Sequence, residues 1–304
     1  VAAASSSSKK KDAPPVGVND IANAKEAGGT NNDITGTDPI GNVLTNDTDA
    51  DSATNTLIVQ DVRGSGASVN INAATINAQT LVQGNFGTLQ IAANGNYSYV
   101  VNNSHANVQE LNANSAPLTD TFTYTVKDTT GLTSVATLSI YVYGTNDAPM
   151  ATADETQARE ASRTTNDTAG INPAGNLLSN DSDVDDNPNS LVVQDIKASD
   201  GALSSVGVGT NASTGERISG NFGTLRIGAN GDYEYIVDNN NVTVQALNTG
   251  SSALVDTFIY TVKDAGGLTS SATLNVSIHG VNDAPSAADK TITFLEDGSK
   301  TFAV

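Results

Sequence analysis

The feature that most constrains the fold of this chain is a passage that occurs twice. Residues 120–149 and residues 256–285 lie 136 positions apart and are identical at twenty of thirty positions. Both copies end in Asn-Asp-Ala-Pro. A passage repeated at a fixed long spacing indicates successive copies of one structural unit. The chain is therefore expected to be a string of similar modules.

Proline-marked junctions divide this string. Asp-Ala-Pro begins the first copy at residues 12–14, and the same three residues return at 147–149 and 283–285. The sequence thus predicts four segments, which are a disordered Ser/Lys linker at 1–11, a first module at 12–147, a second at 148–283 and the start of a third at 284–304. A module of this length can bury a hydrophobic core of its own.

Composition excludes several kinds of partner. The 304 residues contain 33 Asp and Glu against 14 Lys and Arg, and the formal net charge of −19 disfavours nucleic acid and favours divalent cations. There is no cysteine, so disulfides and cysteine-based metal sites are excluded. No apolar stretch approaches the roughly 20 residues of a membrane span, so direct membrane insertion is not expected. Because the chain begins with Val1 and shows no signal peptide, we expect an excerpt or a processed piece.

Alternating apolar and polar residues predict β-strands. Phe86–Ile91 and Tyr97–Val101 flank Asn94-Gly95, a pair that favours a tight hairpin because both residues tolerate positive φ. The second module repeats this pattern around Asn230-Gly231. Short alternating strands separated by turn residues predict an all-β chain of tandem antiparallel β-sandwich domains, which we expect to form an elongated array.

Other segments are assigned from the same pattern. Thr121–Lys127 and Leu132–Val142 are expected to form a second hairpin, with Phe122, Tyr124 and Val126 pointing inward. Val108–Asn112 is expected to be a short helical turn. Residues 63–83 and 197–218 differ most between the two modules, and they are expected to be a variable surface loop or an edge hairpin.

Two loops carry three Asp residues each, at alternate positions. They are Asp47, Asp49 and Asp51 in the first module and Asp181, Asp183 and Asp185 in the second. Three carboxylates held close together repel one another unless a cation lies between them, and Ca²⁺ accepts six to eight oxygen ligands in irregular geometry. A solvated turn explains one Asp in a loop, but the repeated triplet favours calcium.

Acids and amides also gather on both sides of each junction. They are Asp12, Asp20 and Glu26 at the first junction, Asn146, Asp147, Asp154, Glu155 and Glu160 at the second, and Asn282, Asp283, Asp289 and Glu296 at the third. Their carboxylate and carbonyl oxygens would suit a cation that bridges neighbouring modules. The alternative is a polar linker with a turn.

Two further pairs of Asp residues lie at strand ends. Asp128 and Asp264 begin the turns Asp-Thr-Thr-Gly and Asp-Ala-Gly-Gly. A hairpin tip accounts for them, and they are kept as calcium ligands for the case in which the tip reaches a junction. Asp120 and Asp256 stand at strand starts, where they are expected to cap backbone N–H groups.

The order of these motifs resembles that of the VCBS repeat, a module of very large bacterial RTX-type surface adhesins. The motifs that carry the resemblance are Leu44–Asp51, Asn85–Leu89, Ala93–Tyr99, Val108–Leu111, Leu118–Tyr124 and Gly144–Pro149. The resemblance covers both modules. The Asn-Asp-Ala-Pro junction is also similar to the calcium-binding linker of cadherins.

This resemblance implies an immunoglobulin- or cadherin-like sandwich, type I secretion and an extracellular place on the bacterial cell surface. Together with the acidic junctions it leads to the hypothesis of a calcium-stiffened extender that supports adhesion or biofilm formation, with neighbouring modules as its partners. A self-assembling filament or surface-layer subunit is the alternative. Binding of host or microbial glycans is less favoured, because residues 63–83 and 197–218 contain no aromatic side chain.

An enzyme is not expected. The only histidines are His105 and His279, and the corresponding positions of the other module hold Asn241 and Tyr143. Neither module has a nucleophile motif or a phosphate-binding glycine loop.

Overall fold

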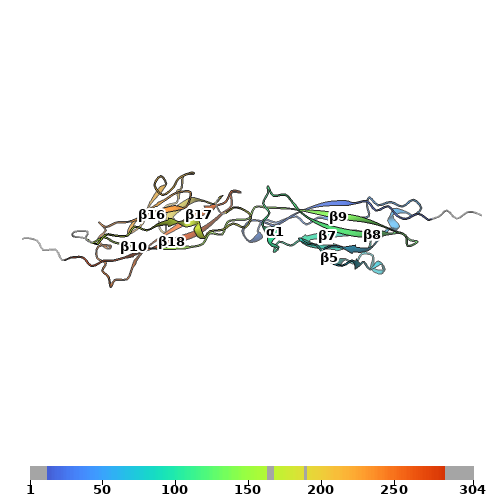
Figure 1. The fold of residues 1–304 in the computed structure, drawn as a ribbon, viewed down its shortest axis with the longest axis horizontal. Coiled ribbons are helices and arrows are strands. Elements are labelled where there is room, and N and C mark those ends of the chain that lie inside the picture. The colour runs from blue at the N-terminus through green and yellow to red at the C-terminus, as the bar shows by residue number, and fades with distance from the viewer. Residues whose placement is uncertain (1–11, 163–167, 188–189, 285–304) are drawn as a thin grey trace, which may run out of the picture. The chain divides into compact units, whose positions relative to one another are not determined.

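The computed structural model describes residues 12–162, 168–187 and 190–284, which Figure 1 draws as a coloured ribbon. Contacts divide these residues into two compact units. The first unit takes the described residues of 12–151, 180–192 and 262–270, and the second takes those of 152–179, 193–261 and 271–284. By their contacts, the loops at 180–192 and 262–270 thus belong to the first unit, although the repeat places them in the second module.

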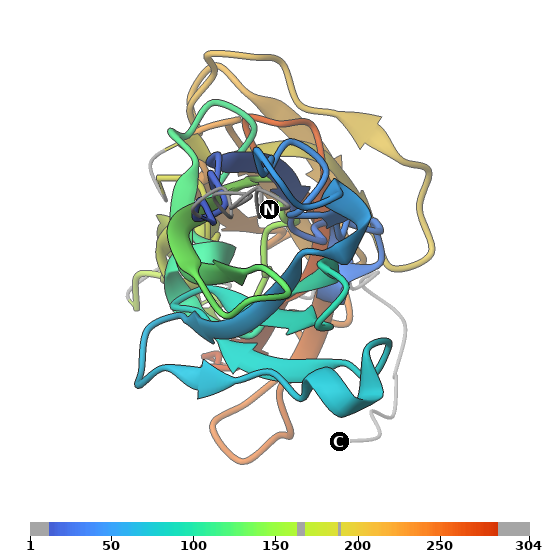
Figure 2. The ribbon, with the colours of Figure 1, turned by 90° about the vertical axis from the view of Figure 1, so that its right-hand side faces the viewer.

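Two sheets form the first unit, with strand orders β1-β9-β8-β3-β4 and β2-β7-β6-β5. The strands are β1 (Asp20–Lys25), β2 (Ile40–Asn42), β3 (Ile58–Arg63), β4 (Val69–Asn70), β5 (Thr80–Gln83), β6 (Gly87–Ile91), β7 (Asn96–Val101), β8 (Leu118–Lys127) and β9 (Thr133–Tyr143). In Figure 2 the cyan strands β6 and β7 lie in a different layer from the green β8–β9 hairpin. Leu89, Tyr99, Phe122 and Tyr124 belong to the core of buried side chains.

The second copy has the same topology, with strand orders β10-β18-β17-β12-β13 and β11-β16-β15-β14. Its strands are β10 (Asp154–Arg159), β11 (Ala174–Asn176), β12 (Val192–Ala198), β13 (Ser204–Ser205), β14 (Glu216–Ser219), β15 (Gly223–Ile227), β16 (Asp232–Val237), β17 (Leu254–Lys263) and β18 (Thr269–His279). The predicted tandem β-sandwich is therefore confirmed.

Helical structure in the described residues is confined to single turns. They are α1 (Ala106–Gln109) and the 3-10 turns η1 (Thr30–Asn32), η2 (Thr54–Thr56), η3 (Ala73–Thr75) and η4 (Leu177–Asn180). The helical turn expected at Val108–Asn112 thus begins two residues earlier, where the His105 side chain accepts a hydrogen bond from the backbone N–H of Asn107 and caps α1. The corresponding Val244–Asn248 forms turns without a helix.

The predicted hairpin of β6 and β7 forms with Leu89 opposite Tyr99 and Ile91 opposite Tyr97. Its turn differs from the expected one, because only Gly95 has a positive φ, of 84°. The Gly95 N–H donates to the Ala92 carbonyl at 3.0 Å. A longer turn that ends in a left-handed glycine needs one residue at positive φ and not two.

The second hairpin joins β8 and β9 with the pairing that its alternation predicts, and Phe122, Tyr124 and Val126 are buried. Asp128 forms its turn, because Oδ1 accepts the backbone N–H groups of Gly131 and Leu132 at 2.7 and 2.9 Å. The segment between β3 and β6 supplies an edge strand to each sheet, β4 to one and β5 to the other. This segment therefore crosses between the layers.

One strand pair in each copy is parallel. Strand β1 pairs with β9 from Asp20–Leu138 to Lys25–Tyr143, and β10 pairs with β18 in the same way. Because paired parallel strands end at the same edge of a sheet, Glu26 after β1 lies beside the residues that follow Tyr143. This pairing places acids that are far apart in the sequence next to each other.

Candidate metal centre

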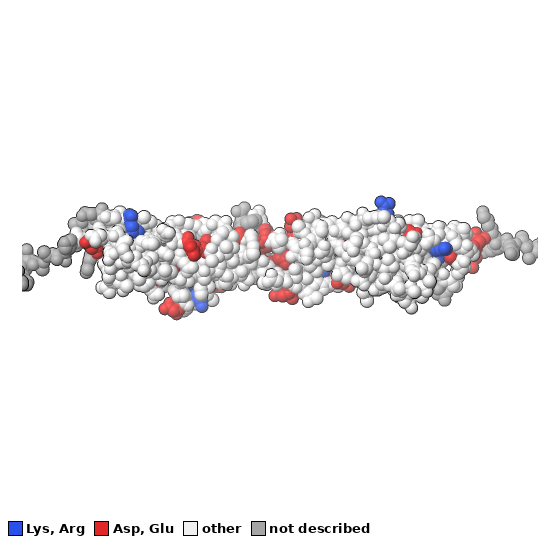
Figure 3. Space-filling view, turned by 90° about the horizontal axis from the view of Figure 1, so that it is seen from below, with Lys and Arg blue, Asp and Glu red and all other residues white. Residues whose placement is uncertain are grey.

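Acidic side chains gather in three groups. The first acid set is Asp12, Asp20, Asp47, Asp49, Asp51 and Asp128; the second is Glu26, Asn146, Asp147, Asp181, Asp183, Asp185 and Asp264; the third is Glu160, Asn282 and Asp283. The first and second sets lie within the first unit, and the third lies within the second unit. On the face drawn in Figure 3, acidic side chains form separate groups and basic side chains are few.

Backbone N–H groups hold the first acid set in place. Asp47 Oδ1 accepts the N–H of Val18 at 2.7 Å, and Asp51 Oδ2 accepts the N–H of Ala13 at 3.0 Å. The Thr130 hydroxyl donates to Asp12 and to Asp128 Oδ1. The start of the module, the Asp-X-Asp loop and the β8–β9 turn therefore meet at one end of the sandwich.

Three buried carboxylate oxygens in this set have no hydrogen-bond donor. Asp47 and Asp128 are 1% and 3% exposed, and Oδ2 of each lacks a hydrogen-bond donor, as does Oδ2 of Asp49. Burial, opposed by the Val18 N–H and reinforced by the charge of Asp20, raises the pKa of Asp47 to about 6. Buried oxygens without donors are costly when the carboxylate is ionised.

Glu26 and Asp147 are two buried acids of the second acid set that follow strands β1 and β9. Glu26 is fully buried, and its Oε1 accepts the N–H of Thr145 at 3.0 Å, while its Oε2 has no donor. Burial raises its pKa to about 7, with the negative charge of Asp147 adding to the shift. Asp147 is 5% exposed with an unpartnered Oδ2, and burial together with the charge of Asp183 raises its pKa to about 6.

The Asp-X-Asp loop approaches Asp147 from another part of the sequence. Asp185 Oδ2 accepts the N–H of Asp147 at 3.0 Å, and the Asp185 carbonyl accepts a hydrogen bond from the Asn112 side chain at 3.0 Å. Asp185 Oδ1 and Asp183 Oδ2 have no donor. Burial, followed by the neighbouring carboxyl group of Asp183, raises the pKa of Asp185.

The tip of the β17–β18 turn completes this set. Asn146 Nδ2 donates to Asp264 Oδ2 at 2.8 Å and to the Asp147 carbonyl at 2.9 Å. A Cβ atom at Gly266 would lie 2.0 Å from Asn146 Oδ1, so a larger residue there would require the Asn146 side chain to move. The turn thus reaches the acids, as the sequence analysis required for Asp264.

The third acid set has the same framework without the loop. Glu160 is fully buried, and its Oε1 accepts the N–H of Val281 at 3.0 Å, as Glu26 accepts that of Thr145. Burial raises the pKa of Glu160, with the charge of Asp283 contributing to the same direction. The predicted ligands Asp289 and Glu296 lie outside the described residues.

Asp20 in the first set and Asp181 in the second differ from the other members in their surroundings, and Asp154 and Glu155 lie outside the three sets. Asp20 and Asp154 accept the hydroxyl groups of Tyr124 and Tyr260 at 2.7 and 2.8 Å, which ties each first strand to its sheet. Glu155 is exposed, and it points to the opposite face of β10 from Asp154. Asp181 is buried, at 6% exposure.

Sequence reasoning did not identify the neutral residues that position these acids. Thr130, Thr145 and Asn112 each hold an acid or its backbone. Thr130 lies in the Asp-Thr-Thr-Gly turn and Thr145 in the Gly144–Pro149 motif, but neither motif predicts these contacts, because each contact is formed by folding. The one available signal was that Asn112 recurs as Asn248.

The donor chemistry fits a hard cation. All unpartnered side-chain atoms in the first two sets are carboxylate oxygens, which are the ligands that Ca²⁺ prefers. Within the described residues, no group of three His, Cys, Asp or Glu side chains is placed so that it could hold a metal ion. Rotation of the carboxylates toward one another would therefore have to accompany cation binding.

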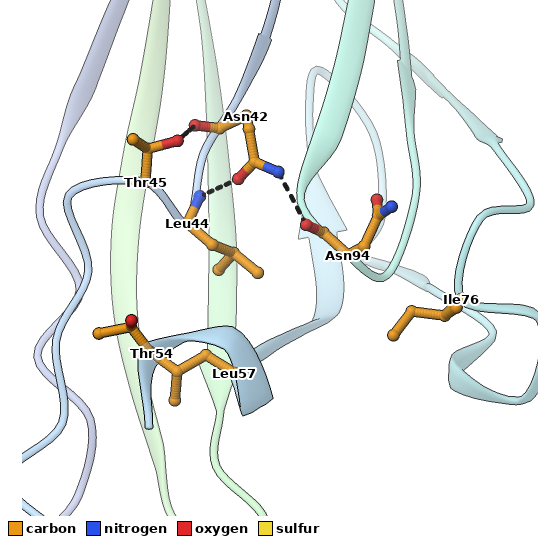
Figure 4. Close-up of a pocket in the computed structure, with 7 residues that line it drawn as sticks. All are labelled: Asn42, Leu44, Thr45, Thr54, Leu57, Ile76 and Asn94. Carbon is orange, nitrogen blue, oxygen red and sulfur yellow. Dashed lines mark hydrogen bonds between the residues drawn. The ribbon is translucent and has the colours of Figure 1, made fainter. Parts of the chain in front are cut away.

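A separate hollow of about 320 Å³ lies near the β6–β7 turn and includes Asn42, Thr54, Ile76 and Asn94 in its lining. Figure 4 shows Asn42 bonded to the Asn94 carbonyl and to the Leu44 N–H. The lining contains neither charged nor aromatic side chains, so it offers a weak chemical basis for ligand recognition.

Comparison with known proteins defines the class. The model of the bacterial cadherin-like domain family matches residues 12–144 and again residues 146–280. The chain belongs to this family, as a tandem pair of its domains. Cadherin-like domains are typically structural or adhesive modules without enzymatic activity, and they function outside the cell. Among the described residues, none of the helices is long and apolar enough to cross a membrane.

Solved structures to which the chain is similar include cadherin ectodomains. Protocadherin gamma B2 domains 3–6 are 13% identical, with a TM-score of 0.40 over 88% of this chain and 53% of that one. Mouse cadherin-23 domains EC22–24 are 13% identical, with a TM-score of 0.37 over 86% of this chain and 63% of that one. The chain spans about half the length of the first of these structures. No curated protein matches the sequence.

Proposed function

We propose that this chain is a calcium-stiffened extender region of a bacterial cell-surface adhesin that supports cell adhesion or biofilm formation. Membership of the bacterial cadherin-like family supports the extracellular adhesive setting. In this proposal the modules are of the VCBS type and the parent protein is exported by type I secretion. Neighbouring modules are the immediate partners of each module.

The unpartnered buried carboxylate oxygens carry the calcium part of the proposal. Glu26 Oε2, Asp147 Oδ2 and Asp185 Oδ1 occur together in the second acid set, and Asp47 Oδ2 and Asp128 Oδ2 occur in the first. Almost all buried polar groups in folded proteins have partners. A bound divalent cation would supply the missing positive charge to several of these oxygens at once.

Cation binding would join segments that are distant in the sequence. In the second acid set, Glu26 follows β1, Asp147 follows β9, and Asp183 and Asp185 lie in the 180–192 loop. These residues would hold the ion, with Asp264 on the adjacent turn orienting Asn146. Three separate stretches of chain would thereby be restrained by one ion, which would stiffen this end of the first unit.

The test is calcium titration of the full chain by calorimetry and thermal unfolding. The wild type is expected to bind Ca²⁺ and to gain about 2.7 kcal/mol of stability at a free calcium concentration of 100 times Kd. Replacement of Asp147 and Asp185 by Asn should remove most of the calcium-dependent increase in Tm that belongs to the second set.

The matched control replaces Asp200 and Glu216 by Asn and Gln. It removes the same number of charges from an exposed and a half-exposed position outside the acid sets, and it should leave calcium binding unchanged. Stiffening is tested by small-angle scattering of the wild type. An equal maximum dimension and equal flexibility with calcium and with chelator would reject that part of the proposal.

A further inference from the structure

The two copies of the buried glutamate have almost identical surroundings. The backbone N–H groups of Glu26 and Glu160 donate to the carbonyls of Tyr143 and His279. Each glutamate accepts a backbone N–H through Oε1 at 3.0 Å, from Thr145 in one copy and Val281 in the other. Each is fully buried. The surroundings of Glu26 and Glu160 can therefore be compared directly, and one difference between them stands out.

The two copies differ in the group that accepts a hydrogen bond from one glutamine side chain. In the second copy Gln245 Nε2 donates to Glu160 Oε2 at 3.1 Å and to the Ala161 carbonyl at 3.3 Å. The corresponding Gln109 Nε2 instead donates to Asn32 Oδ1 at 3.2 Å. Glu26 Oε2 is thereby left without a donor. The same side chain thus satisfies the glutamate in one copy and leaves it open in the other.

Gln109 is close enough to both acceptors to change between them. Gln245, at the equivalent position of the second copy, reaches the glutamate and a backbone carbonyl with the same amide group. Gln109, Asn32, Asp147 and Asp183 line one groove of about 700 Å³ in the first unit, so the amide has room to turn. Asn32 itself has a left-handed backbone, with φ of 61°.

We propose that Gln109 and Gln245 are positioning residues that hold the buried glutamate when no cation does so. In the engaged arrangement, seen at Gln245, the amide donates to the glutamate carboxylate. In the released arrangement, seen at Gln109, it binds Asn32 and leaves Glu26 Oε2 available for a cation. This inference rests on the proposed calcium function and adds a competitor, built into the fold, that weakens calcium binding.

The released glutamine also contacts the loop that holds Asp147. Gly29 N–H donates to the Asn146 carbonyl at 2.9 Å, and Ala148 N–H donates to the Gly29 carbonyl at 3.3 Å. Asn32 belongs to the same loop, in η1. When Gln109 binds Asn32, one side-chain movement both opens Glu26 and adds a hydrogen bond to the loop beside Asp147.

The test compares Gln109→Leu and Gln245→Leu with Gln157→Leu, which alters an exposed glutamine on β10. Without its competing donor, Glu26 should bind Ca²⁺ about 2- to 10-fold more tightly in Gln109→Leu, the range expected for one lost hydrogen bond. In chelator, Gln245→Leu should lower the Tm of the second unit, because Glu160 loses a donor. If Gln109 only supports the fold, Gln109→Leu should weaken calcium binding or leave it unchanged.

Calcium affinity of Gln109→Leu equal to or below that of the Gln157→Leu control would overturn the inference. An unchanged Tm of Gln245→Leu in chelator would also overturn it. If the wild type itself binds no Ca²⁺, the proposed function fails instead. The Gln245→Leu measurement in chelator then still decides whether this glutamine stabilises Glu160.

Discussion

The buried carboxylates of this chain form two chemical groups at the scale of single residues. Asp120 accepts the N–H groups of Asn85 and Phe86 and the Tyr99 hydroxyl, at 2.6, 3.0 and 2.6 Å, so both of its oxygens are satisfied. Asp256 repeats this arrangement with Tyr235. By contrast, an oxygen without a donor occurs on Asp47, Asp49 and Asp128 in the first acid set and on Glu26, Asp147, Asp183 and Asp185 in the second. Complete hydrogen bonding thus separates structural carboxylates from those available to a cation.

Replacement of Tyr99 by Phe should therefore destabilise the first unit without affecting calcium binding. The buried Asp120 carboxylate loses a hydroxyl donor, which should lower the free energy of unfolding by about 1–3 kcal/mol. Chemical denaturation at constant calcium measures the loss. Tyr143→Phe is the control, since Tyr143 is 42% exposed, and its effect should stay within about 0.5 kcal/mol. Equal effects of the two substitutions would contradict the assignment.

At the scale of elements, the sequence predicts what depends on local periodicity. The alternation around Leu89, Tyr99 and Phe122 predicts strands with the correct inward faces, and Asp128 predicts its turn. The parallel pairing of β1 with β9 was not predicted, because it joins residues 118 positions apart, such as Asp20 and Leu138. The alternation of apolar and polar residues predicts which face of an edge strand is buried, but it does not predict which strand pairs with it.

The same limit applies to the candidate metal centre. The Asp triplets are visible in the sequence because their three Asp residues stand at alternate positions of one loop. The burial of Glu26 and the lack of a donor at its Oε2 depend on the segment around Thr145, which is 119 residues away. Gln109 could not be identified from its own copy. Only the contrast with Gln245 in the folded second copy reveals a difference.

The turn between β15 and β16 should tolerate no side chain at its glycine. Gly231 has a φ of 84°, and an added Cβ would lie 2.6 Å from Asn176 Oδ1 and 2.7 Å from Leu178 Cγ. Gly231→Ala should cost about 1–2 kcal/mol for the left-handed backbone and more for the clash. Gly209→Ala is the control in the same unit, since its φ is 75° and no atom lies within 4 Å. A loss no larger than that of Gly209→Ala would refute the packing argument.

At the scale of the whole molecule, the acid sets couple folding, pH and calcium. Glu26, Asp47 and Asp147 have pKa values raised to about 7, 6 and 6 by burial and neighbouring charge, whereas unfolded Asp and Glu titrate at about pH 4. Between these values the folded protein binds protons that the unfolded chain has released. The calcium-free protein therefore loses stability as the pH rises.

Calcium-free protein, prepared by dialysis, should accordingly show a higher Tm at pH 5 than at pH 7.5. The contribution of these acids is complete below about pH 4 and disappears as the pH rises through about 6 to 7, because each group must then ionise without a partner. Saturating calcium should flatten this trend at neutral pH, since the cation stabilises the ionised carboxylates. The triple variant Glu26→Gln, Asp47→Asn and Asp147→Asn should flatten the pH dependence of Tm without calcium.

Differential scanning calorimetry across the pH range measures the Tm in all three cases. A Tm of the calcium-free wild type that increases from pH 5 to pH 7.5 would show that these acids do not control its stability.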